Sequence, residues 1–318
     1  MTSFSLKIIA VFSMLVDHIG AVFPLIAPRM FRWIGRIAFP LFAFMIAQGC
    51  KHTKNIYKYL LRLGIFALIS EAFFDIAFNR RTTPDGVHNW NIDFLNNTNI
   101  FYTLFLGVAC VAIYEGLKTK KRAWLALLPL LLIPTLFTTE VVPVLRGYEN
   151  TILTIVMLIY TVSALYFSRF LQDRNTDNPI TIKHKIIPLL AALPLLLFAD
   201  EALQSDFGAF GVGLIFLFYL TNPDNKISRI IVLTAGLLYF YGTNLFDIFT
   251  DDYFVVIERT LNFDGLWILV FSLITVPLVY FYNGKQGTKN NKVKWAFYTF
   301  YPAHIAILSA IWFIFIGA

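Results

Sequence analysis

Long apolar runs recur from one end of this chain to the other, and they limit the possible fold more than any other feature. Hydrophobic residues make up 58% of the 318 residues, charged residues only 14%, and the mean hydropathy is +0.68. A soluble domain averages about 25% charged residues. The composition therefore excludes an ordinary soluble domain and predicts an all-α, polytopic membrane protein.

The apolar runs are close to the ~20 residues that a helix needs to cross a bilayer. No polar segment between them is long enough for a soluble domain, so we expect one bundle of about 10–11 spans over residues 1–318. The predicted spans are 6–26, 32–49, 58–78, 99–117, 123–139, 150–171, 185–202, 208–222, 228–244, 265–283 and 296–316.

The net charge of +7 is distributed as the positive-inside rule requires. Most Lys and Arg residues fall in short segments that share one side if the N-terminus is cytoplasmic, whereas most acidic residues fall on the other side. This pattern predicts a multi-pass protein of the cytoplasmic membrane and argues against nucleic-acid binding. The two cysteines, Cys50 and Cys110, indicate neither a metal site nor a disulfide. The basic segments are 51–62, 118–122, 169–185, 224–229 and 285–294.

Asp17 and His18 lie in the middle of the first apolar run, where ionisable groups are rare and usually functional. Lys7 precedes His18 by eleven residues, which on a helix is three turns plus roughly 20°, or about 16 Å along the axis. Lys7 and His18 therefore share one helix face. One end of this face can hold an anion at the membrane surface while the other carries out proton chemistry.

Two further ionisable residues, Arg36 and Glu71, reach a comparable depth on the second and third predicted spans. Adjacent helical residues point about 100° apart, so Asp17 cannot readily orient the His18 ring. We expect Arg36 to pair with Asp17, and Glu71 or a polar group on another helix to fix the His18 tautomer. A neutral imidazole suits a general base. The alternative is a buried ion-pair network that only holds helices together.

A second group of side chains is expected near the cytoplasmic surface. Arg62 lies one turn inside its span, where a guanidinium needs an anion, and a coenzyme A thioester would supply one. The positive-inside rule alone also explains many of the basic residues near this surface. Tyr301 and His304, near the C-terminus, can instead be packing residues. The candidates for donor binding are Lys7, Lys58, Arg62, Tyr301 and His304.

On the outer side, the segments 80–97 and 246–264 are long enough to shape an opening for an acceptor, or are ordinary connections. Asp206 is a candidate for binding a cationic acceptor amine. Asp75 and Asn99 are the other candidates for acceptor binding.

Several stretches together resemble the TraX family of membrane proteins, which is named for a conjugation protein that N-acetylates the amino terminus of pilin. They are LKIIAVFSMLVDHIG (6–20), RWIGRIAFPLFAFMIAQG (32–49), the segment 62–75, NIFYTLFLG (99–107), DFGAFGVGLIFLFYL (206–220) and KVKWAFYTFYPAHIAIL (292–308).

The spacing of Lys7 and His18 also resembles that of the wider class of membrane acyltransferases. The resemblance implies transfer of an acyl group from cytosolic coenzyme A to an acceptor at the far side, with the first-helix histidine, here His18, as catalytic residue. It maps further family positions, without settled roles, onto Lys7, Asp17, Arg36, Arg62, Glu71 and His304.

We therefore expect an acetyl-CoA-dependent acetyltransferase, without a metal, that acts on an amine such as the N-terminus of a pilin or peptide. Three alternatives stay open. The acceptor can be a hydroxyl of a cell-surface glycan or lipid, so that the enzyme is an O-acetyltransferase. The chain can be a proton-coupled transporter that uses Asp17, His18 and Glu71 as a relay. It can also be a non-catalytic assembly factor for a pilus or conjugation apparatus.

Overall fold

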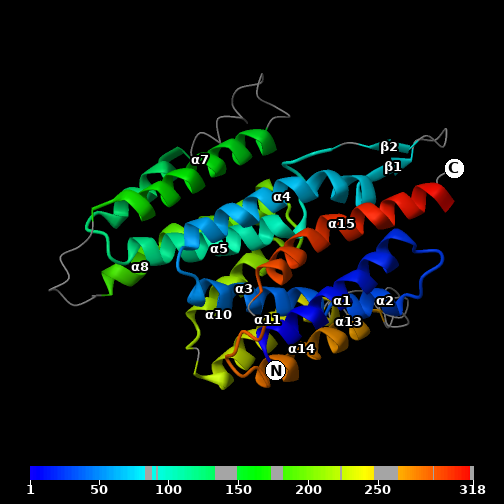
Figure 1. Ribbon diagram of the computed structural model, residues 1–318. Coiled ribbons are helices and arrows are strands. Elements are labelled where there is room, and N and C mark those ends of the chain that lie inside the picture. The colour runs from blue at the N-terminus through cyan, green and yellow to red at the C-terminus, as the bar shows by residue number, and fades with distance from the viewer. Residues whose placement is uncertain are drawn as a thin grey trace. The chain divides into compact units, whose positions relative to one another are not determined.

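In the computed structural model, the described part of the protein consists almost entirely of helices and contains one short antiparallel hairpin (Figure 1). Within the described residues, five helices are long and apolar enough to cross a membrane, which supports the predicted helical, multi-pass architecture: Ser3–Val22, Met30–His52, Ile100–Leu117, Thr151–Phe170 and Asn291–Phe315. The total of 10–11 spans and the cytoplasmic N-terminus stay predictions. The structure describes residues 1–82, 88–90, 92–132, 149–172, 182–222, 224–246, 264–288 and 290–315.

The chain forms two compact units, and each combines segments that are distant in the sequence. The first unit contains Met1–Lys51, Ile69–Ile92 and Leu217–Ala318, and the second contains His52–Leu68 and Asp93–Phe216. The helix α4 (Ile56–Phe78) contributes its first half to the second unit and its second half to the first.

In the first unit, α1 (Ser3–Val22) begins where the Thr2 side chain accepts a hydrogen bond from the backbone N–H of Ser5, at 3.2 Å. It ends at Val22, two residues before Pro24, because Phe23 directly precedes the proline and is therefore disfavoured in helical conformation. The helix packs against α2 (Met30–Gly35) and α15 (Asn291–Phe315), and Figure 1 shows α15 beside α1.

The predicted span 32–49 consists of α2 and α3 (Ala38–His52) with a short break between them. The backbone N–H groups of Arg36 and Ile37 donate to carbonyls three residues earlier, those of Trp33 and Ile34. Because such bonds tighten the last helical turn, the change of geometry falls at Arg36 itself. The two helices still form one continuous apolar stretch from residue 30 to residue 52.

The remaining helices of the first unit are α11 (Lys226–Phe246), α13 (Asp264–Leu273) and α14 (Thr275–Tyr280). α11 packs against α13 and α14, and α13 packs against α2, where the ring of Trp33 lies 5.5 Å from that of Trp267. The strands β1 (Arg80–Thr82) and β2 (His88–Trp90) pair with Arg80 opposite Trp90.

The second unit is built around α5 (Ile100–Leu117), which is buried along almost its whole length and packs against α7 (Glu149–Phe170) and α8 (Lys183–Ala192). The predicted span 185–202 is divided, because Pro194 begins the short α9 (Pro194–Leu197) and a π-helical turn, η3 (Phe198–Ala202), follows. The unit also contains the 3₁₀ helix η1 (Ala123–Leu132) and most of α10 (Gly208–Leu220).

Two sequence expectations fall largely outside the described residues. These are the last part of the predicted span 123–139 and most of the outer segment 246–264. The other outer segment, 80–97, contains the hairpin of β1 and β2.

Candidate functional site

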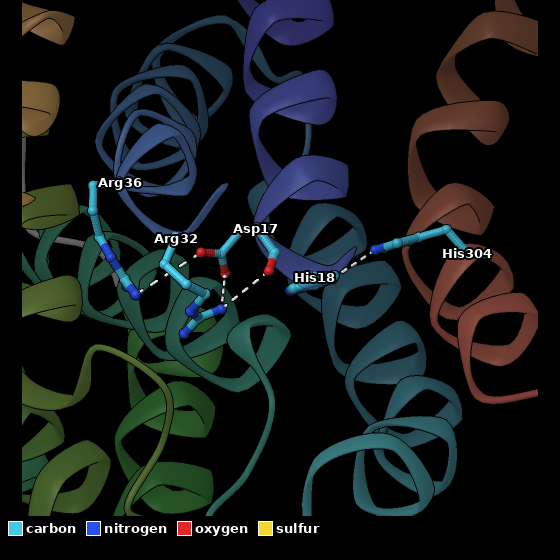
Figure 2. A network of polar contacts seen from close by, with 5 residues as sticks. All are labelled: Asp17, His18, Arg32, Arg36 and His304. Atoms are coloured by element: carbon cyan, nitrogen blue, oxygen red, sulfur yellow. Dashed lines mark hydrogen bonds and ion pairs between the residues drawn. The ribbon is translucent and has the colours of Figure 1, made fainter. Parts of the chain in front are cut away.

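Asp17 and His18 lie on α1 and point toward different neighbouring helices (Figure 2). Asp17 faces α2, whereas His18 faces α15. This divergence follows from the ~100° between successive helical residues. The carboxylate and the imidazole therefore belong to two separate sets of contacts that share one turn of helix.

The Asp17 carboxylate is held between Arg32 of α2 and Arg36, the residue that directly follows α2. Arg32 Nη1 donates to Asp17 Oδ2 at 2.7 Å and to the Asp17 backbone oxygen at 3.2 Å. Arg36 Nη2 lies 3.8 Å from Asp17 Oδ1, and Arg36 Nε is buried without a hydrogen-bond partner. The expected partner Arg36 is therefore present but distant, and Arg32, which sequence reasoning missed, makes the close ion pair. Two guanidiniums beside one carboxylate leave excess positive charge.

The close packing of α1 and α2 depends on glycine at the contact. A Cβ atom at Gly35 would lie 2.1 Å from Asp17 Oδ1 and 2.3 Å from Asp17 Cβ. A Cβ at Gly20 would lie 2.9 Å from Phe31 Cβ. Only a residue without a side chain lets the α2 backbone come this near to Asp17.

His18 forms a hydrogen-bonded pair with His304 of α15. His18 Nδ1 lies 2.6 Å from His304 Nε2, and His304 Nδ1 lies 2.7 Å from the backbone oxygen of Phe300 (Figure 2). The two rings are parallel within 2°, and their centroids are 4.9 Å apart. Because that separation greatly exceeds the distance between the bonded nitrogens, the rings meet edge to edge.

The Phe300 contact fixes the protonation pattern of the neutral pair. A carbonyl oxygen only accepts, so His304 Nδ1 carries the proton and His304 Nε2 is the acceptor. His18 Nδ1 must then donate, which leaves the lone pair of His18 on Nε2. The polar group that fixes the His18 tautomer is thus His304, on another helix, rather than Glu71.

Aromatic rings enclose the histidine pair. The His18 ring lies 5.3 Å from the ring of Phe78 and 5.8 Å from that of Tyr301, while Phe300 stacks on His304 at 4.7 Å. His18 is half-buried and His304 is buried. The predicted pair Tyr301 and His304 is therefore brought directly to His18.

Lys7 lies on the same contact of α1 with α15 as His18. Its Nζ is 5.5 Å from the ring centroid of Phe297, seven residues before His304. The expectation that Lys7 and His18 share one helix face is confirmed, since both side chains contact α15. The contact between α1 and α15 thus has the Lys7 cation near one end and the histidine pair further along. In the predicted orientation, the end with Lys7 faces the cytoplasm.

The predicted acids of α4 lie in the first unit and are buried. Glu71 is fully buried, and Asp75 accepts a hydrogen bond from Asn79 Nδ2 at 2.5 Å. Glu71 and Phe78 are seven residues apart and share one helix face, about two turns from each other. Within the described part of the chain, no group of three or more His, Cys, Asp and Glu side chains is placed to hold a metal ion.

Four predicted residues belong to the second unit. Lys58 is exposed, and the Arg62 guanidinium lies 5.6 Å from the Tyr59 ring. Asn99 is buried: its Oδ1 accepts from the Phe101 N–H at 2.8 Å, and its Nδ2 donates to the Ala67 oxygen at 2.9 Å. These bonds make Asn99 the cap of α5 and a link to α4.

Asp206 lies in a turn at the start of α10. Its backbone N–H donates to the Thr98 oxygen at 2.9 Å, and its backbone oxygen accepts from the Thr103 hydroxyl. The next residue, Phe207, has φ of 64°, which is unusual for a residue other than glycine. The backbone of Asp206 thus holds this turn to the start of α5.

Fold and site together define a multi-pass helical membrane protein with a paired histidine and an aspartate–arginine cluster on its first helix. Residues 3–143 match the model of the TraX protein family, so this part of the chain is a TraX family domain, as its resemblance predicts. The TraX-like stretches 206–220 and 292–308 lie beyond the matched residues.

The chain is also 26% identical to a probable fimbrial assembly protein, FimC of serogroup H1, from Dichelobacter nodosus. The alignment covers 96% of this chain and 94% of the relative. No solved structure matches the chain.

Proposed function

We propose that the protein is a membrane-embedded acetyltransferase that moves an acetyl group from cytosolic acetyl-CoA to an amine acceptor at the membrane or its outer face. The observation that carries the proposal is the orientation of His18. Its Nδ1–H is engaged by His304, which is itself engaged by a backbone oxygen. The lone pair on Nε2 then has a fixed direction, as a general base requires.

In this mechanism His18 Nε2 accepts a proton from the acceptor amine as the amine nitrogen bonds to the thioester carbonyl carbon. The His304 acceptor stabilises the imidazolium that forms, because it binds the proton on His18 Nδ1. The C–S bond then breaks, and the departing thiolate takes the proton from His18 Nε2. The histidine returns to its starting state, so the cycle consumes no other reactant.

Arg36 is the residue proposed to stabilise the oxyanion of the tetrahedral intermediate. Its buried Nε has no hydrogen-bond partner, and its nearest carboxylate oxygen is 3.8 Å away. It therefore keeps donors for a developing negative charge. Asp17 and Arg32 position this guanidinium and are not proposed to touch the substrate.

The proposed donor route begins at the cytoplasmic surface of the cell membrane and follows the contact between α1 and α15. Lys7 would attract the phosphates of acetyl-CoA, with Tyr301 and His304 lining the path of the thioester. Lys58 and Arg62 are further candidates for the phosphates because they lie on the predicted cytoplasmic side. Glu71, Asp75, Asn99 and Asp206 remain candidates for a supporting or acceptor-side role.

The name of the Dichelobacter nodosus relative refers to fimbrial assembly, which makes the N-terminus of a pilus or fimbrial subunit the first acceptor to test. A glycan or lipid hydroxyl is the alternative. The acetyl acceptor is thus proposed to be a component of the cell envelope.

The test is turnover of labelled acetyl-CoA by purified full-length protein in lipid nanodiscs, with a pilin-type N-terminal peptide as acceptor. His18→Ala is expected to lower kcat by at least ~100-fold while the protein remains folded. His52→Ala removes an exposed imidazole at the end of α3 and is the matched control, with turnover unchanged. Wild-type turnover in His18→Ala would refute the assignment.

His304 supplies a second, independent comparison, because its proposed role is to position His18. His304→Leu is expected to lower kcat by roughly 10-fold or more, with KM for acetyl-CoA changed little. His304→Gln keeps an acceptor oxygen for His18 Nδ1–H and should recover part of that loss. Equal activity of the two variants would show that the hydrogen bond has no part in catalysis.

A non-catalytic assembly factor is the second candidate, and the name of the relative favours it. It predicts no acetyl-CoA turnover with any acceptor, and assembly of surface filaments that is insensitive to His18→Ala. Substitutions in the outer segments 80–97 and 246–264 would abolish assembly instead. Acetylated envelope components that disappear in a deletion strain would exclude this candidate.

A further inference from the structure

Arg229 is a buried guanidinium that has no anionic partner among the residues that the structure describes. It lies in the first turn of α11, is 4% exposed, and its Nε is shielded without a hydrogen-bond partner. Among the residues that the structure describes, it forms neither a hydrogen bond nor an ion pair. A buried guanidinium has lost its water and normally gains a carboxylate or phosphate in exchange.

The immediate neighbours of Arg229 are aromatic rings. The guanidinium carbon lies 5.8 Å from the ring centroid of Phe44 and 5.8 Å from that of Tyr282. These two rings meet edge to face at 5.2 Å. Cation–π contacts of this kind offset only part of the lost hydration, and they leave the five N–H donors unused.

A second cation belongs to the same cluster. Lys51 follows Phe44 by seven residues, so it lies on the same face of α3, about 10 Å further along. Lys51 Nζ donates to the backbone oxygens of Phe218 and Thr221 at 3.0 and 2.7 Å, which uses two of its three donors. The positive charge of Lys51 repels that of Arg229. The ring of Phe44 also contacts the ring of Phe218.

One acid acts on Arg229 through its charge but forms no direct contact with it. Asp224 attracts Arg229 electrostatically, but it is exposed on the connection before α11 and forms no ion pair with it among the described residues. Asn225 caps the first turn of α11 through the N–H of Ser228, so this cap is already made within the chain. Within the described part of the chain, the excess positive charge of Arg229 and Lys51 therefore has no counter-charge in direct contact.

We propose that Arg229 and Lys51 form a binding site for a phosphate group where α3 ends and α11 begins. Arg229 would bind two phosphate oxygens through parallel N–H donors, and Lys51 would supply its remaining donor as a point charge. The phosphate belongs either to a soluble phosphorylated ligand or to the headgroup of an anionic lipid. The site is separate from the histidine pair and does not depend on the proposed acetyl transfer.

The test is the melting temperature of full-length protein under two conditions. In neutral maltoside micelles, inorganic pyrophosphate is the soluble probe. In nanodiscs, phosphatidylcholine alone is compared with a 3:1 mixture of phosphatidylcholine and phosphatidylglycerol. A ligand that binds only the folded state raises the melting temperature, here by at least ~3 °C for wild type. Arg229→Gln should lose this rise, whereas Lys226→Gln, an exposed lysine in the same helical turn, should keep it.

The outcomes separate the sources of the phosphate. A response to pyrophosphate identifies a soluble ligand, and a response only to phosphatidylglycerol identifies a lipid headgroup. In phosphate-free micelles Arg229→Gln should melt at or above the wild-type temperature, because it removes a buried charge that lacks a partner.

The proposal is overturned if wild type responds to neither probe, or if Arg229→Gln responds as wild type does. It is also overturned if Arg229→Gln melts well below wild type without phosphate, since the guanidinium would then be structural. Lys51→Met provides the same comparison should Arg229→Gln fail to fold. Acetyl-CoA turnover by Arg229→Gln is a separate readout, so failure of the phosphate site and failure of the acetyltransferase proposal are distinguishable.

Discussion

Replacement of Gly35 by alanine tests whether the contact between α1 and α2 is as close as the structure has it. The new Cβ would lie 2.1 Å from Asp17 Oδ1 and 2.3 Å from Asp17 Cβ and Cγ, whereas ordinary contacts begin at 3.4 Å. The Asp17 side chain cannot simply rotate away, because its own Cβ is fixed to the backbone of α1. The two helices must therefore separate by about 1 Å.

The expected loss of stability has two parts. Overpacking of a tight contact costs about 1–3 kcal/mol. Separation also weakens the bond from Arg32 to Asp17, but Arg32 is 39% exposed and solvent screens it, so this part is about 1 kcal/mol. A total of about 2–4 kcal/mol corresponds to a melting temperature roughly 8 °C below wild type.

The assay is thermal unfolding of purified protein in detergent, followed by intrinsic fluorescence at one fixed scan rate. Gly213→Ala is the matched control within a helix, since its Cβ would make only an ordinary contact of 3.6 Å with Leu196. It should melt at or slightly above the wild-type temperature, because alanine has the higher helix propensity. A Gly35→Ala protein that melts within ~1 °C of wild type would refute the close approach of α2 to Asp17.

Three further changes test contacts described above. Arg32→Lys cannot reach both Oδ2 and the backbone oxygen of Asp17, so it should lower stability by about 1 kcal/mol in the same assay, and a wild-type melting temperature would show that the ion pair is not formed. Asn99→Ala loses the cap of α5 and leaves the Ala67 oxygen without this donor, which predicts a loss of about 2–3 kcal/mol; if stability were kept while KM for the acceptor rose, Asn99 would be a substrate residue after all. Tyr160→Phe removes a 2.6 Å bond to the Ala191 oxygen and should cost about 1 kcal/mol by melting temperature, whereas no change would show that the buried hydroxyl contributes nothing.

The helices were largely predictable because apolar run length and proline position are local properties of the sequence. The first predicted span, 6–26, overshot α1 because Pro24 ends the helix. The divisions at Pro194 and at Ile274 were missed, since a continuous apolar run does not reveal where a helix changes geometry. The cap at Asn99 has a recognisable signal, a side-chain acceptor directly before an apolar run, but the cap was not predicted from it. The prediction that Asn99 contributes to acceptor binding stays a prediction.

The sequence predicts on which face of its helix each site residue lies, but it does not predict which residue each one contacts. The spacing of Lys7 and His18 placed both on one face, and the structure has both against α15. Arg32 was missed because the second span was expected to begin there, which put Arg32 at the surface. The partnership of His18 and His304 depends on how two distant helices pack, and no local pattern in the sequence encodes that.

The two imidazoles are 286 positions apart, so the ribosome adds one of them long before the other. A ribosome-bound chain can insert its early helices while the late partner is still inside the exit tunnel. Any proton chemistry at this pair must wait until residue 304 has been synthesised and its helix has packed against α1. A product that stops before residue 304 would therefore lack the histidine pair. Co-expression of a separate C-terminal fragment that contains residue 304 could restore the pair.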